Sequence, residues 1–540
     1  MHGLMQDWPL NCSRIIDHAA TQHPRREIVS YGPGLKVKRS NYRALRARAL
    51  RVGQQLLRAG IRPGDRVATL ATSTAEHLEV WYGAVGIGAV YHPLNARLGP
   101  DQLNAIIADA EDSILFADAA FAPLVNEMRG NLAKSARVIH FDDGETSRLR
   151  GEESYASWLS DADGDLTWPM LEERSAAALF YTSGTTGKPK GVLYSHRSIV
   201  LLSLTVNATD MYGFSSRDVV LFAVPMYHAN GWSWPFTAPM SGASVVLPGA
   251  NLDAAALTSI IAAEGATISA GVPTLWQSVL DHVAERGGSL APLRKLYIGG
   301  APCPRQMLQT LQDTHGIDVV HAWGMTEMGP TGSLCTLTPE TAALTGEQRL
   351  IVQQRQGKPP FLVEMKLTDD ADNTLPWDDR ATGRLKVRGP CVVRRYFRAD
   401  EDVLDADGYF DTGDIGRIDE NGYMLISDRA KDLVRSGGEW ISSVELENAA
   451  TTHSAVKAAA VVAARHPKWG ERPILVLVLA KGSEISLQQM REHMAKTLPS
   501  WQLPDDLVVV DTLPLTAIGK IDKARLRALY SDRLVSSQSA

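Results

Sequence analysis

The sequence predicts an α/β protein in which a large N-terminal domain is followed by a small α+β C-terminal domain. Three observations support this fold class: the length of the chain, the alternation of helical and strand-like segments in its first half, and a change of pattern after about residue 360. The chain has 540 residues, whereas one hydrophobic core stops growing near about 250–300 residues. At least two cores are therefore expected.

Helical and strand-like segments alternate regularly through the first half. Residues 42–57 carry apolar side chains at helical spacing, residues 66–70 have the pattern of a strand, and a second helical stretch contains His77, Val80 and Ala84. Further strands are expected at 113–116, 138–141, 176–181, 219–224, 244–247, 267–270, 295–298 and 319–323. This alternation favours stacked, largely parallel sheets, whose ligands gather at the carboxyl ends of the strands.

After about residue 360 the expected strands become shorter and the turns denser. Turn signals such as Gly383, Gly389 and the pair Asp407–Gly408 indicate an antiparallel, β-barrel-like part of the large domain. Beyond Asp428, strands are expected at 456–462 and 474–479 and an amphipathic helix at 487–498. This last stretch of about 110 residues has the size of a small separate domain.

Composition and charge argue against several classes of protein. The apolar share of 44% and the charged share of 21% are ordinary for a globular protein. The net charge is −6, and without a Lys/Arg stripe neither nucleic acid nor an anionic membrane is expected as a partner. The N-terminal segment lacks the pattern of a signal peptide, and no apolar run of about 18 residues is present. We therefore expect a cytoplasmic protein without integral membrane association, and a homodimer is left open.

The four cysteines are far apart in the sequence, with neither a Cys-x-x-Cys pair nor a nearby histidine at metal-ligand spacing. This spacing argues against a zinc site and against a disulfide framework. Reduced thiols are expected, as in a reducing compartment. The four residues are Cys12, Cys303, Cys335 and Cys391.

The most informative segment is the run 182–191, which reads TSGTTGKPKG and follows an expected strand. Consecutive hydroxyl residues, glycines and two lysines give a loop with many donors that suits the polyphosphate of a nucleotide. A hydroxyl such as that of Thr182 can also serve the accompanying metal ion. The spacing differs from that of a Walker A loop, and a flexible polar hairpin is the alternative interpretation. The candidate phosphate-binding residues are Thr182, Ser183, Gly184, Thr185, Thr186, Gly187, Lys188 and Lys190.

Seven further motifs follow in a fixed order, and together with the loop they resemble the adenylate-forming superfamily. This superfamily contains acyl- and aryl-CoA synthetases, firefly luciferase and the adenylation domains of peptide synthetases. Within it the chain is similar to bacterial medium-chain acyl-CoA ligases and methylthio-propionate-CoA ligases. The motifs are PMYHAN (225–230), GGAP (299–302), HAWGMTE (321–327), YFDTGD (409–414), DRAKD (428–432), SGGEW (436–440) and LTAIGK (515–520).

The resemblance implies a ligase that works in two steps, using ATP and CoA as co-substrates and Mg²⁺ as cofactor. A carboxylic acid is first converted to its acyl-adenylate with release of pyrophosphate, and the acyl group then passes to the thiol of CoA with release of AMP. Lys520 is implied to stabilise negative charge on the α-phosphate, and positioning and charge supply most of such catalysis. Glu327 and Thr182 are implied to hold magnesium, and His228 to orient the carboxylate.

The resemblance also implies which residues contact the nucleotide and which form the hinge. Asp414 would accept the ribose hydroxyls, and the glycines at 299 and 300 would let the adenine lie against the backbone. Lys431 matches a hinge about which the small domain rotates, which gives a division into residues 1–430 and 431–540. The nucleotide-contacting candidates outside the loop are Gly299, Gly300, Ala301, Trp323, Gly324, Met325, Thr326, Asp414, Arg429, Lys431, Arg435 and Lys520.

Several indole side chains are expected around the acyl group, which favours a short- to medium-chain acid over a long one. Branched, aryl and thioether acids stay open, as do a free-standing enzyme that loads a carrier protein and an inactive binding homologue. The acyl-pocket candidates are His228, Asn230, Trp232, Trp234, Trp323 and Met328. The candidates for the path of the CoA arm are Ser436, Gly437, Gly438, Glu439 and Trp440.

Overall fold

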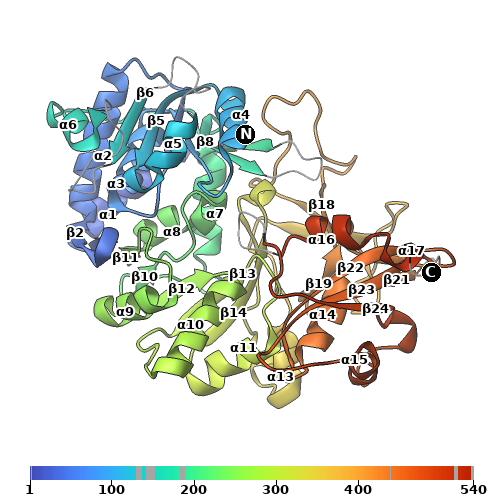
Figure 1. Cartoon of the computed structure of the whole chain (residues 1–540). Coiled ribbons are helices and arrows are strands. Elements are labelled where there is room, and N and C mark those ends of the chain that lie inside the picture. The colour runs from blue at the N-terminus through green and yellow to red at the C-terminus, as the bar shows by residue number, and fades with distance from the viewer. Residues whose placement is uncertain are drawn as a thin grey trace. The chain divides into compact units, whose positions relative to one another are not determined.

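The computed structural model of the chain describes residues 1, 3–128, 137–141, 153–182, 189–437, 439–515 and 521–536. Contacts divide the chain into two compact units, and Figure 1 shows the elements of each. The first unit comprises Met1–Ala342, Lys358–Glu364 and Arg388–Phe410, and the second comprises Ala343–Gly357, Met365–Val387 and Asp411–Ala540. The division expected at residue 430 concerns a motion rather than contacts, and it stays a prediction.

The first unit contains an eight-stranded sheet in the order β15-β14-β13-β12-β10-β11-β1-β2. The strands from β14 to β1 are parallel to their neighbours, and only the two edge strands, β15 and β2, are antiparallel. The strands are β1 (Glu27–Tyr31), β2 (Val37–Asn41), β10 (Val219–Leu221), β11 (Ser244–Leu247), β12 (Ile268–Gly271), β13 (Lys295–Gly299), β14 (Asp318–Gly324) and β15 (Thr331–Leu334). The carboxyl ends of β10, β13 and β14 therefore lie along one edge.

A seven-stranded sheet in the order β7-β6-β5-β3-β4-β8-β9 also belongs to the first unit. Its strands are parallel except for β9, which returns antiparallel to β8. Two apolar clusters cover its faces, one with side chains from α2 and α3 and one with side chains from α4 and α5. The strands are β3 (Arg66–Leu70), β4 (Val90–Pro93), β5 (Asp112–Asp118), β6 (Arg137–Phe141), β7 (Glu153–Ser154), β8 (Ala176–Thr182) and β9 (Lys190–Ser195).

Helices α3–α6 and α8–α11 of the first unit lie between successive strands of one sheet, as in βαβ units. They are α1 (Ser13–Gln22), α2 (Tyr42–Arg58), α3 (Ala75–Gly86), α4 (Pro100–Ala110), α5 (Ala122–Met128), α6 (Tyr155–Ser160), α7 (His196–Val206), α8 (Trp234–Ser241), α9 (Ala254–Glu264), α10 (Pro273–Arg286), α11 (Arg305–Gln309) and α12 (Pro339–Ala342). Asn41, Thr74 and Asp253 cap α2, α3 and α9 with side-chain oxygens, which explains where these helices begin.

The second unit holds two smaller sheets. The β-barrel-like part expected after residue 360 is a four-stranded sheet in the order β16-β17-β18-β19, and the other sheet has the order β21-β20-β23-β22 with β24 beside β23. Its strands are β16 (Glu364–Thr368), β17 (Gly383–Arg388), β18 (Phe410–Ile418), β19 (Met424–Arg429), β20 (Val434–Ser436), β21 (Glu439–Ile441), β22 (Val456–His466), β23 (Gly470–Leu479) and β24 (Asp506–Val509). Its helices are α13 (Gly346–Gln353), α14 (Ser443–Thr451), α15 (Leu487–Met494), α16 (Lys523–Tyr530) and α17 (Arg533–Ser536).

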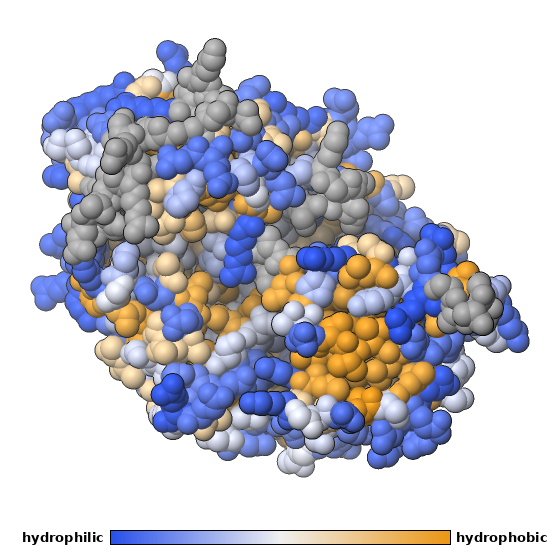
Figure 2. Space-filling model, viewed as in Figure 1, coloured by the Kyte–Doolittle hydropathy of each residue, from blue (hydrophilic) through white to orange (hydrophobic). Residues whose placement is uncertain are grey.

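Apolar clusters cover both faces of the β20–β24 sheet, one with side chains from α14 and α15 and the other with side chains from α16 and α17. In Figure 2 an apolar area appears over this part of the chain. Exposed apolar side chains in the second unit include Val509, Leu515 and Leu529. Among the described residues no helix combines the length and the apolar character needed to cross a membrane. All four cysteines are buried, and none of them forms a disulfide in this structure.

The expected elements are present, with four boundaries shifted by three or more residues. The strand expected at 456–462 continues to His466, and the strand expected at 474–479 begins at Gly470. The strand expected to reach Val224 ends at Leu221, because the Ala223 N–H donates back to the Leu221 carbonyl at 3.0 Å and turns the chain out of the sheet. The helix expected to reach Leu498 ends at Met494. Pro499 follows directly after Leu498, and the residue before a proline is disfavoured in a helix.

Candidate active site

The phosphate loop joins two antiparallel strands in the first unit. Thr182 is the last residue of β8 and pairs across the hairpin with Lys190, the first residue of β9. The Lys190 ammonium lies over the ring of Tyr396, with Nζ 4.8 Å from the ring centre. The predicted residues Ser183, Gly184, Thr185, Thr186, Gly187 and Lys188 lie outside the described part of the chain. The hairpin thus fixes both ends of the loop.

Glu327 follows β14, and three hydrogen bonds from two separate segments hold it and the preceding Thr326. The Tyr396 hydroxyl donates to its Oε1 at 3.0 Å, and the Val393 N–H donates to its carbonyl at 2.7 Å. The Tyr194 hydroxyl, from β9, donates to the carbonyl of the preceding Thr326 at 2.5 Å. Since Glu327 is only 8% exposed, its carboxylate has a fixed position beside elements that flank the phosphate loop.

Tyr396 stays protonated at neutral pH and therefore acts as a hydrogen-bond donor to Glu327. Burial, together with the Glu327 carboxylate, raises the pKa of the Tyr396 phenol above its usual range. Burial also raises the pKa of the Tyr194 phenol well above its usual value, with a contribution from Glu327. Both tyrosines therefore act as hydrogen-bond donors to residues 326 and 327.

The GGAP segment lies at the end of β13, where it meets β14 and an indole. Gly299 pairs with Ala322 of β14, and a Cβ on Gly299 would come within 2.8 Å of the Ala322 carbonyl oxygen and within 3.0 Å of the Trp232 ring. Gly300 has a φ of +80°, a conformation that glycine adopts without strain. These two positions therefore need glycine, and Ala301 follows them.

Trp323 and Met328 both pack against Gly332 of β15. A Cβ at Gly332 would lie 2.5 Å from Met328 Sδ and 2.5 Å from the Trp323 ring. Together with Trp232 beside Gly299, these contacts place three predicted acyl-pocket residues at the carboxyl ends of β13 and β14. Gly324 and Met325 follow Trp323, and a Cβ at Gly324 would overlap the Pro330 carbonyl.

The segment after His228 has an unusual backbone. Residues 229–233 all have positive φ, between 38° and 66°, and this conformation costs roughly 1–2 kcal/mol for each residue other than glycine. Strain of this kind gathers at functional sites. Asn230 is fully buried, and neither atom of its side-chain amide has a hydrogen-bond partner among the described residues. Trp234, by contrast, packs in the core against aromatic rings including that of Tyr212, so its place is structural.

In the second unit the predicted ribose contact and the DRAKD motif meet across two strands. Asp414 on β18 pairs with Arg429 on β19, and Arg429 Nε lies 3.2 Å from an Asp414 carboxylate oxygen. Asp414 is buried, whereas Arg429 is about half exposed. Lys431 follows β19 in a turn, and Arg435 lies on β20, where its N–H donates to Glu471.

The predicted path of the CoA arm lies between β20 and β21. The Ser436 hydroxyl accepts a hydrogen bond from Arg472 at 3.1 Å, and the Gly437 N–H donates to the Trp469 carbonyl at 2.8 Å. Gly437 has a φ of +63°, and a Cβ there would touch the Trp469 ring. Glu439 and Trp440 lie on β21 and pair with residues of β20. Gly438 and Lys520 lie outside the described residues.

The first unit contains a donor set that suits magnesium better than a metal held wholly by protein. Among the described residues no group of three or more His, Cys, Asp or Glu side chains is placed to hold a metal ion. Mg²⁺ keeps several waters and takes other oxygens from substrate phosphates, so it needs only one or two protein oxygens. The two predicted ligands, the Glu327 carboxylate and the Thr182 hydroxyl, would supply oxygens of this kind.

Comparisons with known proteins agree with the motifs. A family model described as AMP-binding enzyme matches residues 16–397, and one described as AMP-binding enzyme C-terminal domain matches residues 445–520. The chain belongs to the AMP-binding enzyme family. Membership confirms the expected adenylate-forming superfamily and the expected α/β fold class with a small C-terminal domain.

Relatives match this family member over their whole length. It is 45% identical to a 3-methylmercaptopropionyl-CoA ligase of Ruegeria lacuscaerulensis, over 99% of this chain and 100% of that one. It is 41% identical to a medium-chain-fatty-acid–CoA ligase of Ectopseudomonas oleovorans, over 100% of each. Among solved structures, an anthranilate CoA ligase with bound anthranoyl-AMP has the same fold, with a TM-score of 0.86 at 24% identity over 99% of this chain and 100% of that one.

Three contacting residues were not predicted from the sequence. Tyr396, Gly332 and Trp469 lie outside the motifs, although each touches a motif residue. Trp469 is part of the segment RHPKWGERP (465–473), which also resembles the medium-chain acyl-CoA ligases, so its neighbours gave a signal. Tyr396 and Gly332 gave none, because the contact of Tyr396 joins distant segments and those of Gly332 depend on the antiparallel return of β15 beside β14.

Proposed function

We propose that this enzyme is an ATP-dependent acyl-CoA synthetase that converts a short- or medium-chain carboxylic acid to its acyl-adenylate and then to its CoA thioester. The observation that carries the proposal is the buried Glu327 carboxylate, fixed by Tyr396 next to the elements that flank the phosphate loop. Full-length similarity to relatives named as CoA ligases supports the same conclusion.

The first half-reaction brings two anions together, a carboxylate and the α-phosphate of ATP. The phosphate loop and Lys190 would bind the polyphosphate, and Glu327 with Thr182 would hold Mg²⁺. The ion, when bound, supplies charge neutralisation for the phosphates. His228 would orient the acid, and Asp414 with Arg429 would bind the ribose. Lys520 would donate to the oxygens on which negative charge develops, as preorganised donors do in such reactions.

The second half-reaction would need a change at the hinge residue Lys431. The thiol of CoA must approach the acyl carbon, so Lys520 would first have to move away from that carbon. Ser436 and Gly437 would then line the path of the CoA arm beside Trp469, because glycine allows close approach of a ligand. Glu439 and Trp440 border the same path.

The acid itself is proposed from the pocket walls and from the names of relatives. Trp232, Trp323 and Met328 are bulky and lie at the strand ends, which favours acids of roughly four to ten carbons over palmitate-like chains by the limited volume that such side chains leave. A thioether acid and a medium-chain fatty acid are the acids named for two relatives. A cytoplasmic location and a homodimer stay predictions, tested by cell fractionation and light scattering.

A screen of acids tests the proposal most directly. Purified enzyme with Mg²⁺, ATP and CoA would be given acids from C2 to C12 together with branched, aryl and thioether acids, and the release of pyrophosphate and AMP would be measured. We expect turnover with acids of intermediate length. Pyrophosphate release that does not lead to a CoA thioester would instead favour an enzyme that loads a carrier protein, and no turnover with any acid would favour an inactive homologue.

The role of Lys520 is tested by separating the half-reactions. Lys520→Ala should lower the rate of acyl-adenylate formation by about 10²–10³, as the loss of a preorganised donor does. It should largely spare thioester formation from supplied acyl-adenylate and CoA. Equal loss in both half-reactions would contradict the role assigned to Lys520.

A further inference from the structure

The left-handed turn formed by residues 229–233 carries the indole of Trp232. Every residue of the turn has a positive φ, which costs free energy for all of them except Gly231. The Asn230 amide inside the turn is fully buried and has no hydrogen-bond partner among the described residues, which adds to this cost. Contacts from outside the turn must therefore hold it in this conformation.

The hydroxyl of Tyr212 reaches the backbone of this turn. It donates to the Trp232 carbonyl at 3.3 Å, and it lies 2.9 Å from the hydroxyl oxygen of Thr331 on β15. Because a carbonyl oxygen only accepts, the single hydroxyl proton of Tyr212 goes to Trp232, and the Thr331 hydroxyl donates to Tyr212. Burial raises the pKa of Tyr212 to about 12, so this proton stays in place at neutral pH.

Tyr212 is itself fixed in the core of the first unit. It is 1% exposed, and its ring packs edge to face against the rings of Trp234 and Tyr297. The Tyr297 hydroxyl, from β13, also donates to the Tyr212 carbonyl at 2.8 Å. Since side chains in a close-packed interior have little freedom to move, the Tyr212 hydroxyl is a fixed point between β13, β15 and the turn.

The Trp232 indole forms a wall of the proposed acyl pocket. A Cβ on Gly299 would lie 3.0 Å from the Trp232 ring, so the indole covers the end of β13. The remaining residues of the turn are buried, whereas Trp232 is partly exposed. A shift of the Trp232 backbone would therefore move the indole away from Gly299 and enlarge the space at the end of β13.

We propose that Tyr212 is a positioning residue that sets the chain-length preference of the enzyme. Its hydroxyl holds the Trp232 carbonyl, and thereby keeps the indole against the end of β13, where it shortens the acyl pocket. Without this hydroxyl the strained turn would relax and the indole would leave Gly299. The inference rests on the proposed function, because it assigns Trp232 to the acyl pocket, and it adds a residue that lies outside every motif.

The variant Tyr212→Phe tests the proposal, because it removes only the hydroxyl. We expect the ratio of kcat/KM for octanoate over butanoate to rise by about tenfold, since the longer acid gains space and the shorter acid loses contact with the indole. The KM for ATP should change by less than about threefold, whereas a general loss of folded enzyme would affect all substrates alike. An unchanged ratio in folded Tyr212→Phe would overturn the proposal.

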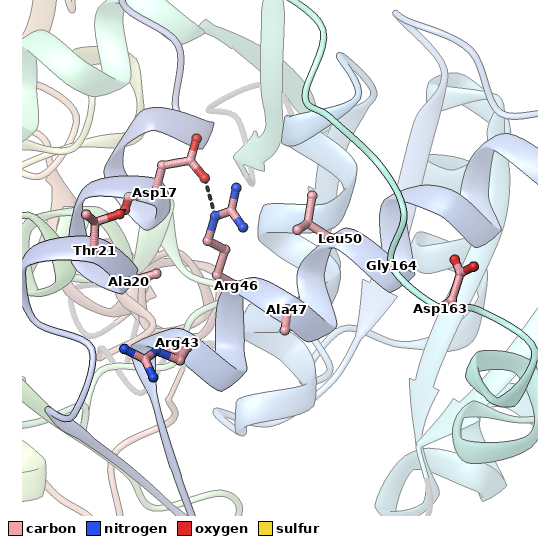
Figure 3. Close-up of a pocket in the computed structure, with 9 residues that line it drawn as sticks. All are labelled: Asp17, Ala20, Thr21, Arg43, Arg46, Ala47, Leu50, Asp163 and Gly164. Atoms are coloured by element: carbon pink, nitrogen blue, oxygen red, sulfur yellow. Dashed lines mark hydrogen bonds and ion pairs between the residues drawn. The ribbon is translucent and has the colours of Figure 1, made fainter.

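The variant Tyr42→Phe is the matched control. Tyr42 is also fully buried, and its hydroxyl also donates to a carbonyl, that of Ala243, at 2.5 Å. It begins α2, whose residues Arg43 and Arg46 line the pocket drawn in Figure 3 rather than the ends of β13 and β14. Tyr42→Phe should therefore lose stability and keep the wild-type ratio, and an equal rise in both variants would assign the effect to lost stability.

A double-variant cycle shows whether Tyr212 acts through the indole. Trp232→Ala removes the indole, so the addition of Tyr212→Phe should then change the ratio by less than about twofold. A further tenfold change in this background would contradict a route through Trp232. Thr331→Val keeps the branched side chain and removes the donor to Tyr212, so it should raise the ratio by about threefold. If Tyr212→Phe does not fold, an unchanged ratio in Thr331→Val would decide against the proposal.

Hydrogen exchange tests the turn without any acid. The Gly231 N–H donates to the His228 carbonyl at 2.9 Å, and its exchange should become at least about tenfold faster in Tyr212→Phe but not in Tyr42→Phe. Unchanged exchange in Tyr212→Phe would show that its hydroxyl does not hold the turn. If the wild-type enzyme used no acid, the proposed function would fail, while exchange would still decide whether Tyr212 fixes residues 229–233.

Discussion

The contacts of Glu327 show that a residue outside the motifs, Tyr396, can orient a motif residue. The Glu327 carboxylate is buried, and one of its oxygens accepts the hydroxyl of Tyr396. Lys190 lies over the opposite part of the same tyrosine, against its ring. Tyr396 thus links a cation of the phosphate hairpin to the carboxylate proposed as magnesium ligand, and it sets the orientation of that carboxylate.

The change Tyr396→Phe removes this hydrogen bond and keeps the ring under Lys190. A hydrogen bond to a charged group contributes about 1.5–3 kcal/mol, so we expect the KM for Mg·ATP to rise by about tenfold, with a smaller effect on the KM for the acid. Steady-state kinetics at varied magnesium would measure it, with Glu327→Ala as the reference for complete loss. An unaltered magnesium dependence in Tyr396→Phe would show that the hydrogen bond does not set the site.

Gly332 controls the space between Trp323 and Met328. In Gly332→Ala the added methyl would lie 2.5 Å from both side chains, so they must move toward the proposed acyl pocket. A methylene in an apolar pocket is worth roughly 10–200-fold in kcat/KM, and we expect the ratio of kcat/KM for octanoate over butanoate to fall by about tenfold. Gly99→Ala, where a Cβ meets no atom within 4 Å, should leave the ratio unchanged.

These residues also show what the sequence could not predict about the site. The resemblance to the adenylate-forming superfamily predicted Thr182, Glu327 and Asp414 as site residues, because each belongs to one of the short motifs that carry it. The partners Tyr396 and Gly332 belong to no motif. The contact of Tyr396 with Glu327 joins segments far apart in the chain, and the contacts of Gly332 depend on how β15 turns back beside β14. Asn230 was predicted to line the pocket, but nothing in the sequence indicates its left-handed backbone, or that its buried amide has no hydrogen-bond partner among the described residues.

Helices α2, α3 and α6 pack together around one buried carboxyl group, that of Glu79. Glu79 on α3 is 5% exposed at its side chain; Arg48 Nε donates to it at 2.6 Å and the Tyr155 hydroxyl at 2.8 Å. Burial nevertheless raises the pKa of Glu79 to about 7. The amphipathic pattern of α2 was visible in the sequence, whereas an acid between apolar faces could not be foreseen.

The raised pKa makes the stability of this packing depend on pH. The protonated form of Glu79 is favoured in the folded state, so its contribution is complete below about pH 4.5 and is lost as the pH rises to about 7. One pKa unit corresponds to about 1.4 kcal/mol, so the loss is about 3 kcal/mol. Glu79→Gln should therefore reduce the fall in unfolding free energy between pH 5 and 7.

Denaturant unfolding of the first unit at several pH values would measure this difference. The variant Glu285→Gln, at an exposed position on α10, should keep the wild-type dependence on pH. A parallel decline in wild type and Glu79→Gln would assign the pH dependence to other groups.

At the scale of the whole molecule, the sequence predicted the architecture better than the boundaries. Parallel strands, an antiparallel part after residue 360 and a small final sheet were all expected from the pattern of apolar residues and turns. The compact units, however, interleave along the chain, since Lys358–Glu364 and Arg388–Phe410 belong with the first unit. Strand pairing of this kind depends on contacts between distant segments, which local patterns do not encode.

The two half-reactions are proposed to need different conformations of the hinge at Lys431. The variant Lys431→Pro tests whether that hinge exists. Proline fixes φ near −65° and restricts the residue before it, so rotation at this position should be blocked while side chains elsewhere stay the same. If the conformation that proline permits is the adenylating one, acyl-adenylate formation persists and thioester formation falls by at least about a hundredfold, because one reacting geometry is lost. If proline instead permits only the conformation for thioester formation, acyl-adenylate formation falls and thioester formation persists. Separate assays of the half-reactions measure both rates, with Lys431→Ala as the control that keeps the backbone free. Equal rates in Lys431→Pro and Lys431→Ala for both half-reactions would place the change between the two steps at another residue.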